Sequence, residues 1–270
     1  MTTAEAKFTA KDVQALRQAT GAGMLDARRA LVENDGDFEK AKRWLREHGL
    51  AGAAKRSDRE RSEGAVSVVV LENGRVGAVV ALECETDFVA KSADFVHLVD
   101  TLAERYASEG EQALASNQDA VDELRVTLKE NIAVGRHARF EAAADSVLDS
   151  YLHVQNGRGV NGVLVELAGG DAALAHAVAV HIAFARPEYL RRDEVPAAVI
   201  ADERAAIEAT ARNEGKPEAQ MDKIVAGRLE GWYKEHVLLD QPYARDEKQS
   251  IATLLGPAEV RRFAQVIAGG

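Results

Sequence analysis

The stretch Val66-Ser67-Val68-Val69-Val70-Leu71-Glu72-Asn73-Gly74-Arg75-Val76-Gly77-Ala78-Val79-Val80-Ala81-Leu82 places two apolar runs on either side of an Asn-Gly pair. Runs rich in β-branched residues are typical of strands, and Asn-Gly between them favours the positive φ angles of a tight hairpin turn. After this stretch, apolar residues recur at helical spacing as far as about Tyr106. The stretch therefore predicts a β-hairpin followed by a helix.

The same order of elements recurs at residues 151–190. Tyr151–Gln155 and Val163–Leu167 read as strands around a glycine-containing turn two residues longer than the first, and Asp171–Ala185 reads as a helix. A strand hairpin followed by a helix, found twice, predicts the α+β class with two related core subdomains.

Helical patterns surround these two units. Three short helices are predicted before residue 50: one opened by a capping box at Thr9-Ala10-Lys11-Asp12, one over about Met24–Asn34, and one over Phe38–His48 that Gly49 ends. Residues 111–148 are predicted to be helical because five apolar residues are spaced for one face. These five are Leu114, Val121, Leu124, Leu128 and Ile132.

Pro196 to about His236 contains two helical runs separated by Asn213–Pro217, which predicts a helical hairpin. Ile251–Leu255 and Val260–Ile267 then complete the second subdomain. The expected domains are a three-helix head at 1–50, a charged linker at 51–63, a first core subdomain at 64–148, a second core subdomain in two parts at 149–196 and 237–270, and the inserted hairpin at 197–236.

The residues Glu85-Thr86-Asp87-Phe88-Val89-Ala90-Lys91-Ser92 stand where the strand pattern stops and the helical pattern starts. This change of period predicts a corner near Thr86, where Thr86 or Asp87 can cap the helix. Phe88 can enter the core there as the first apolar residue of the helix, or it can be exposed.

Thr86-Asp87-Phe88-Val89-Ala90-Lys91 resembles the signature of the elongation factor Ts family, the guanine-nucleotide exchange factors of bacterial elongation factor Tu. Ser92 departs from the Asn that the family usually has at the end of this signature. The resemblance extends over essentially the whole chain, including the segments Gly21–Asp26, Ala30-Leu31, Gly36-Asp37, Ala41 and His181–Pro187.

The resemblance implies a ubiquitin-associated-like head, a projecting coiled-coil hairpin and an exposed tip at Asp87 and Phe88 that enters the partner GTPase near its Mg²⁺ and phosphates. The implied partner-binding residues are Thr86, Asp87, Phe88 and Val89. His181 is expected to be a secondary partner contact or to support the tip, with a hydrogen-bonded core histidine as an equal alternative. Whether the hairpin projects or packs flat on the body stays open.

Charge and composition limit the other function classes. The net charge of −10 argues against a general nucleic-acid binder, although residues 1–61 carry +3 and the remainder −13. The linker at 51–63 could form a nucleic-acid arm, but its interleaved acidic residues favour a solvated connector. With no long apolar run, no signal-like start and one cysteine, we expect a cytoplasmic protein that contacts no membrane.

Catalytic and cofactor motifs give little support to an enzyme. Gly157, Gly159 and Gly162 match a dinucleotide fingerprint, but strands flank them and we expect them to form a turn. His176 and His181 are five residues apart, which is the wrong spacing for a metal pair on a helix. An enzyme built on Cys84 and its acidic neighbours would need residues that point to opposite faces of a strand. We therefore expect no catalytic residue, no metal and no cofactor.

The predicted partner is elongation factor Tu, in its GDP-bound and nucleotide-free states, and a homodimer of the factor stays open. The alternative function is an adaptor that binds a modifier-like protein through the three-helix head.

Overall fold

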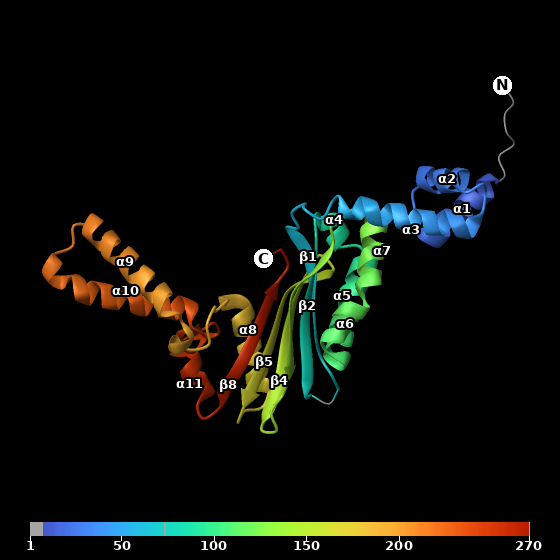
Figure 1. Cartoon of the computed structure of the whole chain (residues 1–270). Helices are drawn as coiled ribbons and strands as arrows, with labels where there is room; N and C mark the ends of the chain where they lie inside the picture. The colour runs from blue at the N-terminus through green and yellow to red at the C-terminus, as the bar shows by residue number, and fades with distance from the viewer. Residues whose placement is uncertain (1–7, 73, 270) are drawn as a thin grey trace.

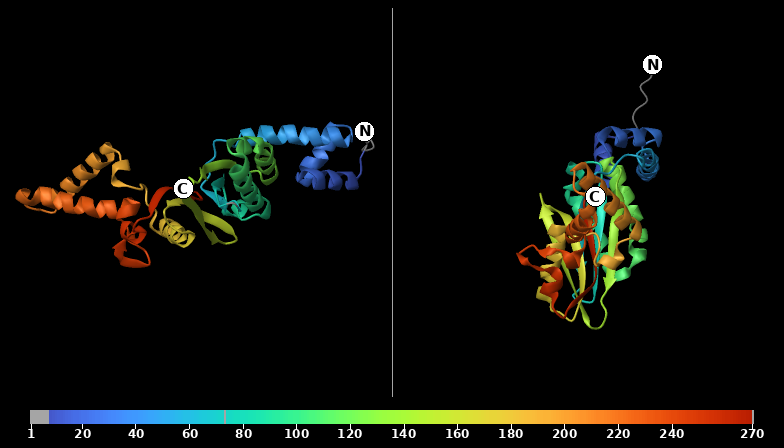
Figure 2. Two further views of the ribbon diagram at one scale, coloured as in Figure 1. Left: turned by 90° about the horizontal axis from the view of Figure 1, so that it is seen from below. Right: turned by 90° about the vertical axis from the view of Figure 1, so that its left-hand side faces the viewer.

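The structure is a computed structural model that describes residues 8–72 and 74–269. A helical head, a body with two three-stranded sheets and a helical hairpin follow one another along an elongated molecule (Figures 1 and 2). The predicted α+β class is confirmed. Asn73 of the predicted hairpin turn and residues 1–7 of the predicted head lie outside the described residues.

The head contains the three predicted helices, α1 (Ala10–Thr20), α2 (Met24–Glu33) and α3 (Phe38–Ala54). Thr9 caps α1 through the predicted reciprocal capping box with Asp12, and Gly21 ends it in the left-handed conformation. The apolar faces of the helices meet in a small core of their own, formed by Val13, Leu16, Ala27, Ala30, Leu31, Ala41 and Leu45.

The third helix does not end at Gly49, so that prediction is wrong. The helix α3 continues to Ala54 and occupies the first part of the predicted linker. The reason is tertiary: α3 crosses α7 (Gln118–Leu128), and a Cβ atom at Gly49 would lie 2.5 Å from Cγ1 of Val126. Gly49 therefore permits a close helix contact, which outweighs its weak helix propensity.

The two core subdomains contain antiparallel three-stranded sheets with the same connectivity. The first sheet has the order β1-β2-β3, with β1 (Glu63–Val70), β2 (Val76–Cys84) and β3 (Ala133–Glu141). The second has the order β4-β5-β8, with β4 (Ser146–Gln155), β5 (Arg158–Ala168) and β8 (Glu259–Ile267). In each sheet a hairpin is joined by a third strand that returns from later in the chain and pairs with the second strand. The predicted internal repeat is confirmed.

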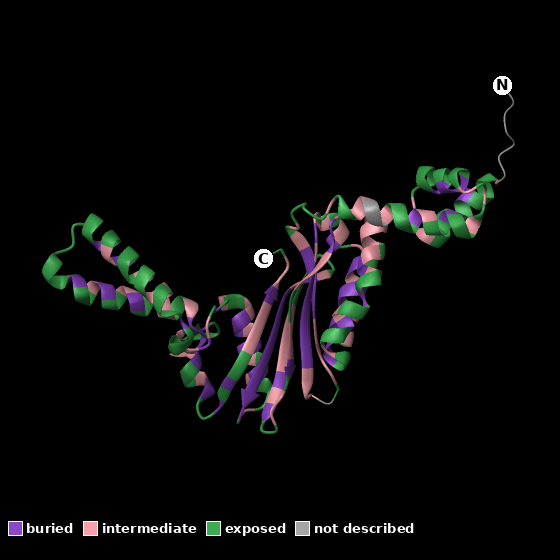
Figure 3. Ribbon diagram, in the orientation of Figure 1, coloured by how far each residue is buried: buried purple, intermediate pink, exposed green. Residues whose placement is uncertain are grey.

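The body has four layers: helix, sheet, sheet, helix. In β2, Ala78, Val80 and Leu82 face α5 (Ala93–Glu109), whereas Val79 and Ala81 face the other sheet. In β5, alternate residues likewise face either the first sheet or α8 (Ala172–Ala185). Both faces of the central strands are buried, as their purple colour in Figure 3 shows. This explains why these strands read as continuous apolar runs.

The prediction of one helical segment over residues 111–148 is wrong in its second half. Two helices, α6 (Glu111–Ser116) and α7, are followed by β3 and by the start of β4. Lys129 adopts a φ of 59° and ends α7. The sequence does not predict β3 because it is an edge strand of mixed residues in which only Phe140 is buried, so it has no apolar run.

The glycines of the dinucleotide-like pattern do not all form a turn. Only Gly157 lies in the β4–β5 turn, with a φ of 79°, whereas Gly159 and Gly162 belong to β5. A Cβ atom at Gly159 would lie 2.1 Å from the carbonyl oxygen of Val66, and one at Gly162 would lie 2.7 Å from Cγ1 of Val66. These two glycines therefore allow β5 to cross β1 at close range.

The helices α9 (Ala197–Asn213) and α10 (Met221–His236) form the predicted helical hairpin, which projects from the body (Figures 1 and 2). The two helices share a separate apolar core, formed by Ile207, Ala211, Met221, Val225 and Leu229. Beyond it, β6 (Pro242–Tyr243), β7 (Asp246–Ser250) and α11 (Ile251–Leu255) lead back to β8. Within the described residues, no helix has the length and apolar character needed to cross a membrane.

Replacing Gly159 with alanine should lower the free energy of unfolding by about 1–3 kcal/mol, because the new methyl group would collide with the backbone of β1. The matched control is Gly227→Ala in the middle of α10, where a Cβ atom meets nothing within 4 Å. That substitution should stabilise by about 0.5–1 kcal/mol. Urea unfolding measures both values, and equal effects of the two substitutions would contradict the close approach of the sheets.

Candidate partner-binding site at the strand-to-helix corner

The predicted corner lies between the end of β2 and the start of α5. A single helical turn, α4 (Asp87–Ala90), joins them, and the side chain of Thr86 caps it by accepting a hydrogen bond from the amide of Val89. Ala90 is fully buried, which anchors α4 to the body, whereas the side chain of Phe88 is 82% exposed. The expectation of an exposed Phe88 is confirmed, and the alternative that it enters the core is contradicted.

A basic residue lies beside the two tip residues. Lys91 forms an ion pair with Asp87, and its ammonium nitrogen lies 5.9 Å from the centre of the Phe88 ring. The hydrogen bond from Lys91 holds the pKa of Asp87 below its ordinary value, so this carboxylate is ionised at neutral pH. The tip thus presents an apolar ring next to a paired carboxylate.

The predicted linker is largely exposed, and two of its arginines pair with the stem of the corner. Arg59 lies 3.4 Å from the carboxylate of Glu85, and Arg61 lies 3.1 Å from that of Glu83. From the second subdomain, Arg158 donates to the carbonyl oxygen of Asp87 at 3.4 Å. These basic residues are engaged within the protein, which argues against a nucleic-acid arm.

Cys84 does not have the environment of a reactive thiol. Its side chain is fully buried, and its Sγ donates to the carbonyl oxygen of Thr86 at 3.3 Å. Burial, assisted by the negative charge of Glu130, raises the pKa of the thiol to about 12. Because the thiolate is the nucleophilic form, this arrangement does not favour the alternative of a thiol enzyme.

His181 is in the core of the second subdomain, with 1% of its surface exposed. Its Nε2 atom lies 2.9 Å from the amide oxygen of Gln241, and its Nδ1 atom accepts from the amide of Ala244 at 3.2 Å. Both ring nitrogens are therefore satisfied in one neutral tautomer, and burial lowers the pKa of the ring. This matches the core-histidine alternative, and His181 contributes only the floor of the small pocket that Phe184 also lines.

The residue that sequence reasoning missed is Phe184, one turn after His181 and 78% exposed. It lines a shallow pocket of about 310 Å³ together with Lys234, Pro242 and Glu247. The helix α8 is apolar almost throughout, so its sequence does not distinguish the buried face from the exposed one. In the described chain, Phe88 and Phe184 are the two exposed phenylalanines of the seven that the protein contains.

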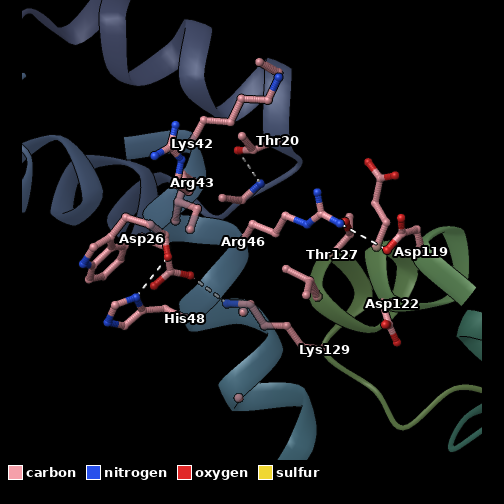
Figure 4. A pocket seen from close by; sticks show the side chains of 18 of the residues that line it. Thr20, Asp26, Lys42, Arg43, Arg46, His48, Asp119, Asp122, Thr127 and Lys129 are labelled. Atoms are coloured by element: carbon pink, nitrogen blue, oxygen red, sulfur yellow. Dashed lines mark hydrogen bonds and ion pairs between the residues drawn. The ribbon is translucent and has the colours of Figure 1, made fainter. Parts of the chain in front are cut away.

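A larger cleft of about 1000 Å³ separates the head from α7. Figure 4 shows charged side chains crossing it: Arg46 pairs with Asp119 at 3.1 Å, and Lys129 pairs with Asp26 at 2.9 Å. The sequence alone could not predict this cleft, because the residues that pair across it are 73 and 103 positions apart. Across the described ranges 8–72 and 74–269, no group of three or more His, Cys, Asp or Glu side chains is placed to hold a metal ion.

A family model described as "Elongation factor TS" matches residues 85–269, from the corner to the end of β8. The chain belongs to the elongation factor Ts family. Among curated relatives, the elongation factor Ts of Renibacterium salmoninarum is 46% identical over 95% of this chain and 96% of its own length. Those of Kineococcus radiotolerans and Streptomyces griseus subsp. griseus are 45% and 43% identical, each over 98% of this chain and 99% of the relative.

Membership of the elongation factor Ts family makes this protein a translation elongation factor with an exchange-factor role in protein biosynthesis. The match to relatives covers the head, the body and the hairpin alike.

The buried thiol leads to a chemical test. We expect Cys84 of the native protein to react with iodoacetamide at pH 8 at least about 100-fold more slowly than in the denatured protein, because the thiolate is scarce and covered. Mass spectrometry of label uptake measures this. A Ser108→Cys variant, with a second thiol on an exposed position of α5, provides an internal control and should take up one label quickly and one slowly. Rapid labelling of both would contradict the structure.

The buried imidazole leads to a pH dependence. At about pH 7.5, His181→Gln should lower the free energy of unfolding by about 1–3 kcal/mol, because a buried hydrogen-bond pair is disrupted. Since the folded-state pKa of His181 is lowered, the unfolded chain binds the proton first as the pH falls below about 6.5. The contribution of His181 is therefore present above that pH and is lost below it. Urea unfolding of both proteins should give a smaller difference at about pH 5.5, and a constant difference would refute this assignment.

Proposed function

We propose that this protein binds elongation factor Tu in its GDP-bound state and accelerates the release of GDP by inserting the Asp87-Phe88 tip near the Mg²⁺ and phosphates of the GTPase. GTP then binds to the emptied partner. The observation that carries this proposal is the 82% exposure of Phe88 on a capped and anchored corner. Thr86 and Val89 belong to the same contact surface, because they form the cap and the first turn that hold the tip.

The energetics require more than one contact. Accelerating release about 10⁴-fold requires about 5.5 kcal/mol of differential interaction free energy, whereas burying one Phe side chain contributes about 1.5–3 kcal/mol. Other surfaces must therefore supply the rest. Coupling between two ligands of the same protein is reciprocal. GDP therefore weakens the binding of this protein to elongation factor Tu by the same ratio by which this protein weakens the binding of GDP.

Two further exposed apolar positions could supply the remaining binding free energy. Leu25 on α2 of the head is 79% exposed and has exposed Met24 beside it, and Phe184 on α8 is 78% exposed. We assign the secondary contact of the second subdomain to Phe184 and its pocket, in place of the buried His181. In this proposal, the head and the second subdomain provide affinity, and the tip provides exchange.

The parts differ in their apolar cores, although the two core subdomains also share an apolar layer and β4 of the second sheet begins at Ser146, inside the range expected for the first subdomain. The head at 1–50, the first core subdomain at 64–148, the second core subdomain at 149–196 and 237–270, and the hairpin at 197–236 are proposed as the functional units, with α3 extending into the region assigned to the linker. A protein acting on elongation factor Tu works where translation occurs, so we place it in the cytoplasm.

Phe88→Ala should lower the rate of GDP release at saturating factor by roughly 10- to 100-fold, which corresponds to the burial energy of one Phe side chain. Because the ring is exposed in the free protein, the free energy of unfolding should change by less than about 0.5 kcal/mol. Asp87→Ala should have the same direction and a smaller effect. Fluorescent GDP displaced from elongation factor Tu gives the rate, and urea unfolding gives the stability.

The matched control is Phe184→Ala, the other exposed Phe. It should raise the concentration of factor needed for half-maximal exchange and leave the maximal rate within about twofold of the original. A folded Phe88→Ala protein with full exchange activity would exclude the tip as the exchange element.

A further inference from the structure

The carboxylate of Glu130 binds the base of the tip, although it is more than 40 residues away in sequence. Its Oε2 atom accepts hydrogen bonds from the amides of Glu85 at 3.0 Å and Thr86 at 3.1 Å, and its Oε1 atom accepts from the Thr86 hydroxyl at 2.6 Å. Three hydrogen bonds to an ionised acceptor form a strong and directional set. They all come from the two residues that precede Asp87.

Thr86 connects Glu130 to the helical turn of the tip. Its hydroxyl donates to Glu130 and at the same time accepts from the amide of Val89 at 3.4 Å. The position of the cap, and with it the first turn that carries Phe88, is therefore determined by where the carboxylate of Glu130 lies.

The neighbours of Glu130 reach two other parts of the chain. Lys129 pairs with Asp26 of the head. Asn131, only 3% exposed, donates from its backbone to Glu85 at 2.7 Å and from its side chain to the carbonyl oxygens of Ser57 at 2.9 Å and Arg59 at 2.7 Å. Three consecutive residues thus contact the head, the tip and the segment between them, which all lie at one end of the body (Figure 1).

We infer that Glu130 is a positioning residue for nucleotide exchange: it holds the Asp87-Phe88 tip in its ordered corner before the partner arrives. This inference rests on the proposed function of the tip. Glu130 acts through Thr86 and does not itself contact the partner. A tip without this acceptor keeps its exposed ring but samples other orientations, so fewer encounters present Phe88 in the inserting geometry. The binding surfaces of the head and of Phe184 are separate from the Glu130 carboxylate and stay intact.

Glu130→Ala should lower the maximal rate of GDP release by about tenfold, while the factor concentration for half-maximal exchange stays within about twofold. Glu130→Gln, which keeps an acceptor oxygen of the same length but no charge, should restore part of the rate. The matched control is Glu123→Ala, which removes an exposed carboxylate from the preceding helix α7 and should leave both quantities unchanged.

Amide hydrogen exchange distinguishes positioning from a general loss of stability. In Glu130→Ala the amides of residues 85–91 should exchange faster, while those of β1 and β2 keep their protection. Faster amide exchange throughout the first sheet would mean that Glu130 only stabilises the fold. Unchanged amide exchange at residues 85–91 would refute the positioning role of Glu130. If the alanine variant does not fold, Glu130→Gln carries the same measurement.

Phe88→Ala serves as the reference for the proposed function itself. If Phe88→Ala loses exchange activity and Glu130→Ala keeps it in full, the positioning role is refuted and the proposed function stands. If Phe88→Ala keeps full activity, the proposed function fails, and the hydrogen-exchange measurement still decides whether Glu130 orders the corner.

Discussion

The close approach of β1 and β5 determines how the rest of the molecule is arranged. It brings the two sheets face to face over a shared apolar layer that includes Val66, Val79 and Leu164. Glycines at the crossing of β5 over Val66 leave room for the backbone of β1. Because each sheet is covered by a helix on its other side, the central strands have no solvent face. The two subdomains are consequently one body, and the turn after β4 can place Arg158 against the tip of the other subdomain.

The parts of this fold that the sequence predicts are those governed by local patterns. The Asn-Gly hairpin, its repeat, the corner at Thr86 and the helical hairpin each have a period or a turn signal of their own. The failures occur where a tertiary contact decides. Gly49 reads as a helix end but permits the contact of α3 with Val126, and β3 is held as a strand by its pairing with β2 although its residues are mixed. The family resemblance implied that Phe88 is exposed. The exposure of Phe184 could not be predicted, because α8 is apolar on almost all sides and its sequence does not distinguish the exposed face.

The uneven charge of the chain has a structural counterpart at the junction of head and body. Arg46, Arg59 and Arg61 of the basic N-terminal region pair with acidic residues of the body, Asp119, Glu85 and Glu83. Exposed pairs such as Arg46 with Asp119 contribute only about 0–1 kcal/mol each and are screened by salt. These ion pairs therefore favour one orientation of the head but contribute little free energy to its attachment. The stem of the tip is better fixed, because hydrogen bonds from Asn131, which is 3% exposed, join it to the chain that precedes β1.

The fixed position of the stem of the tip matters for the energetics of the proposed exchange. Ordering one residue of a flexible segment costs about 1–2 kcal/mol of conformational entropy, which is close to the 1.5–3 kcal/mol that burial of one Phe side chain contributes. A tip that became ordered only on insertion would lose most of what Phe88 gains. In this chain the cap at Thr86, the buried Ala90 and the carboxylate of Glu130 impose that order during folding. In the proposed mechanism, the free energy of burying the ring is then available to displace the nucleotide, because the order of the corner is established before Phe88 meets the partner.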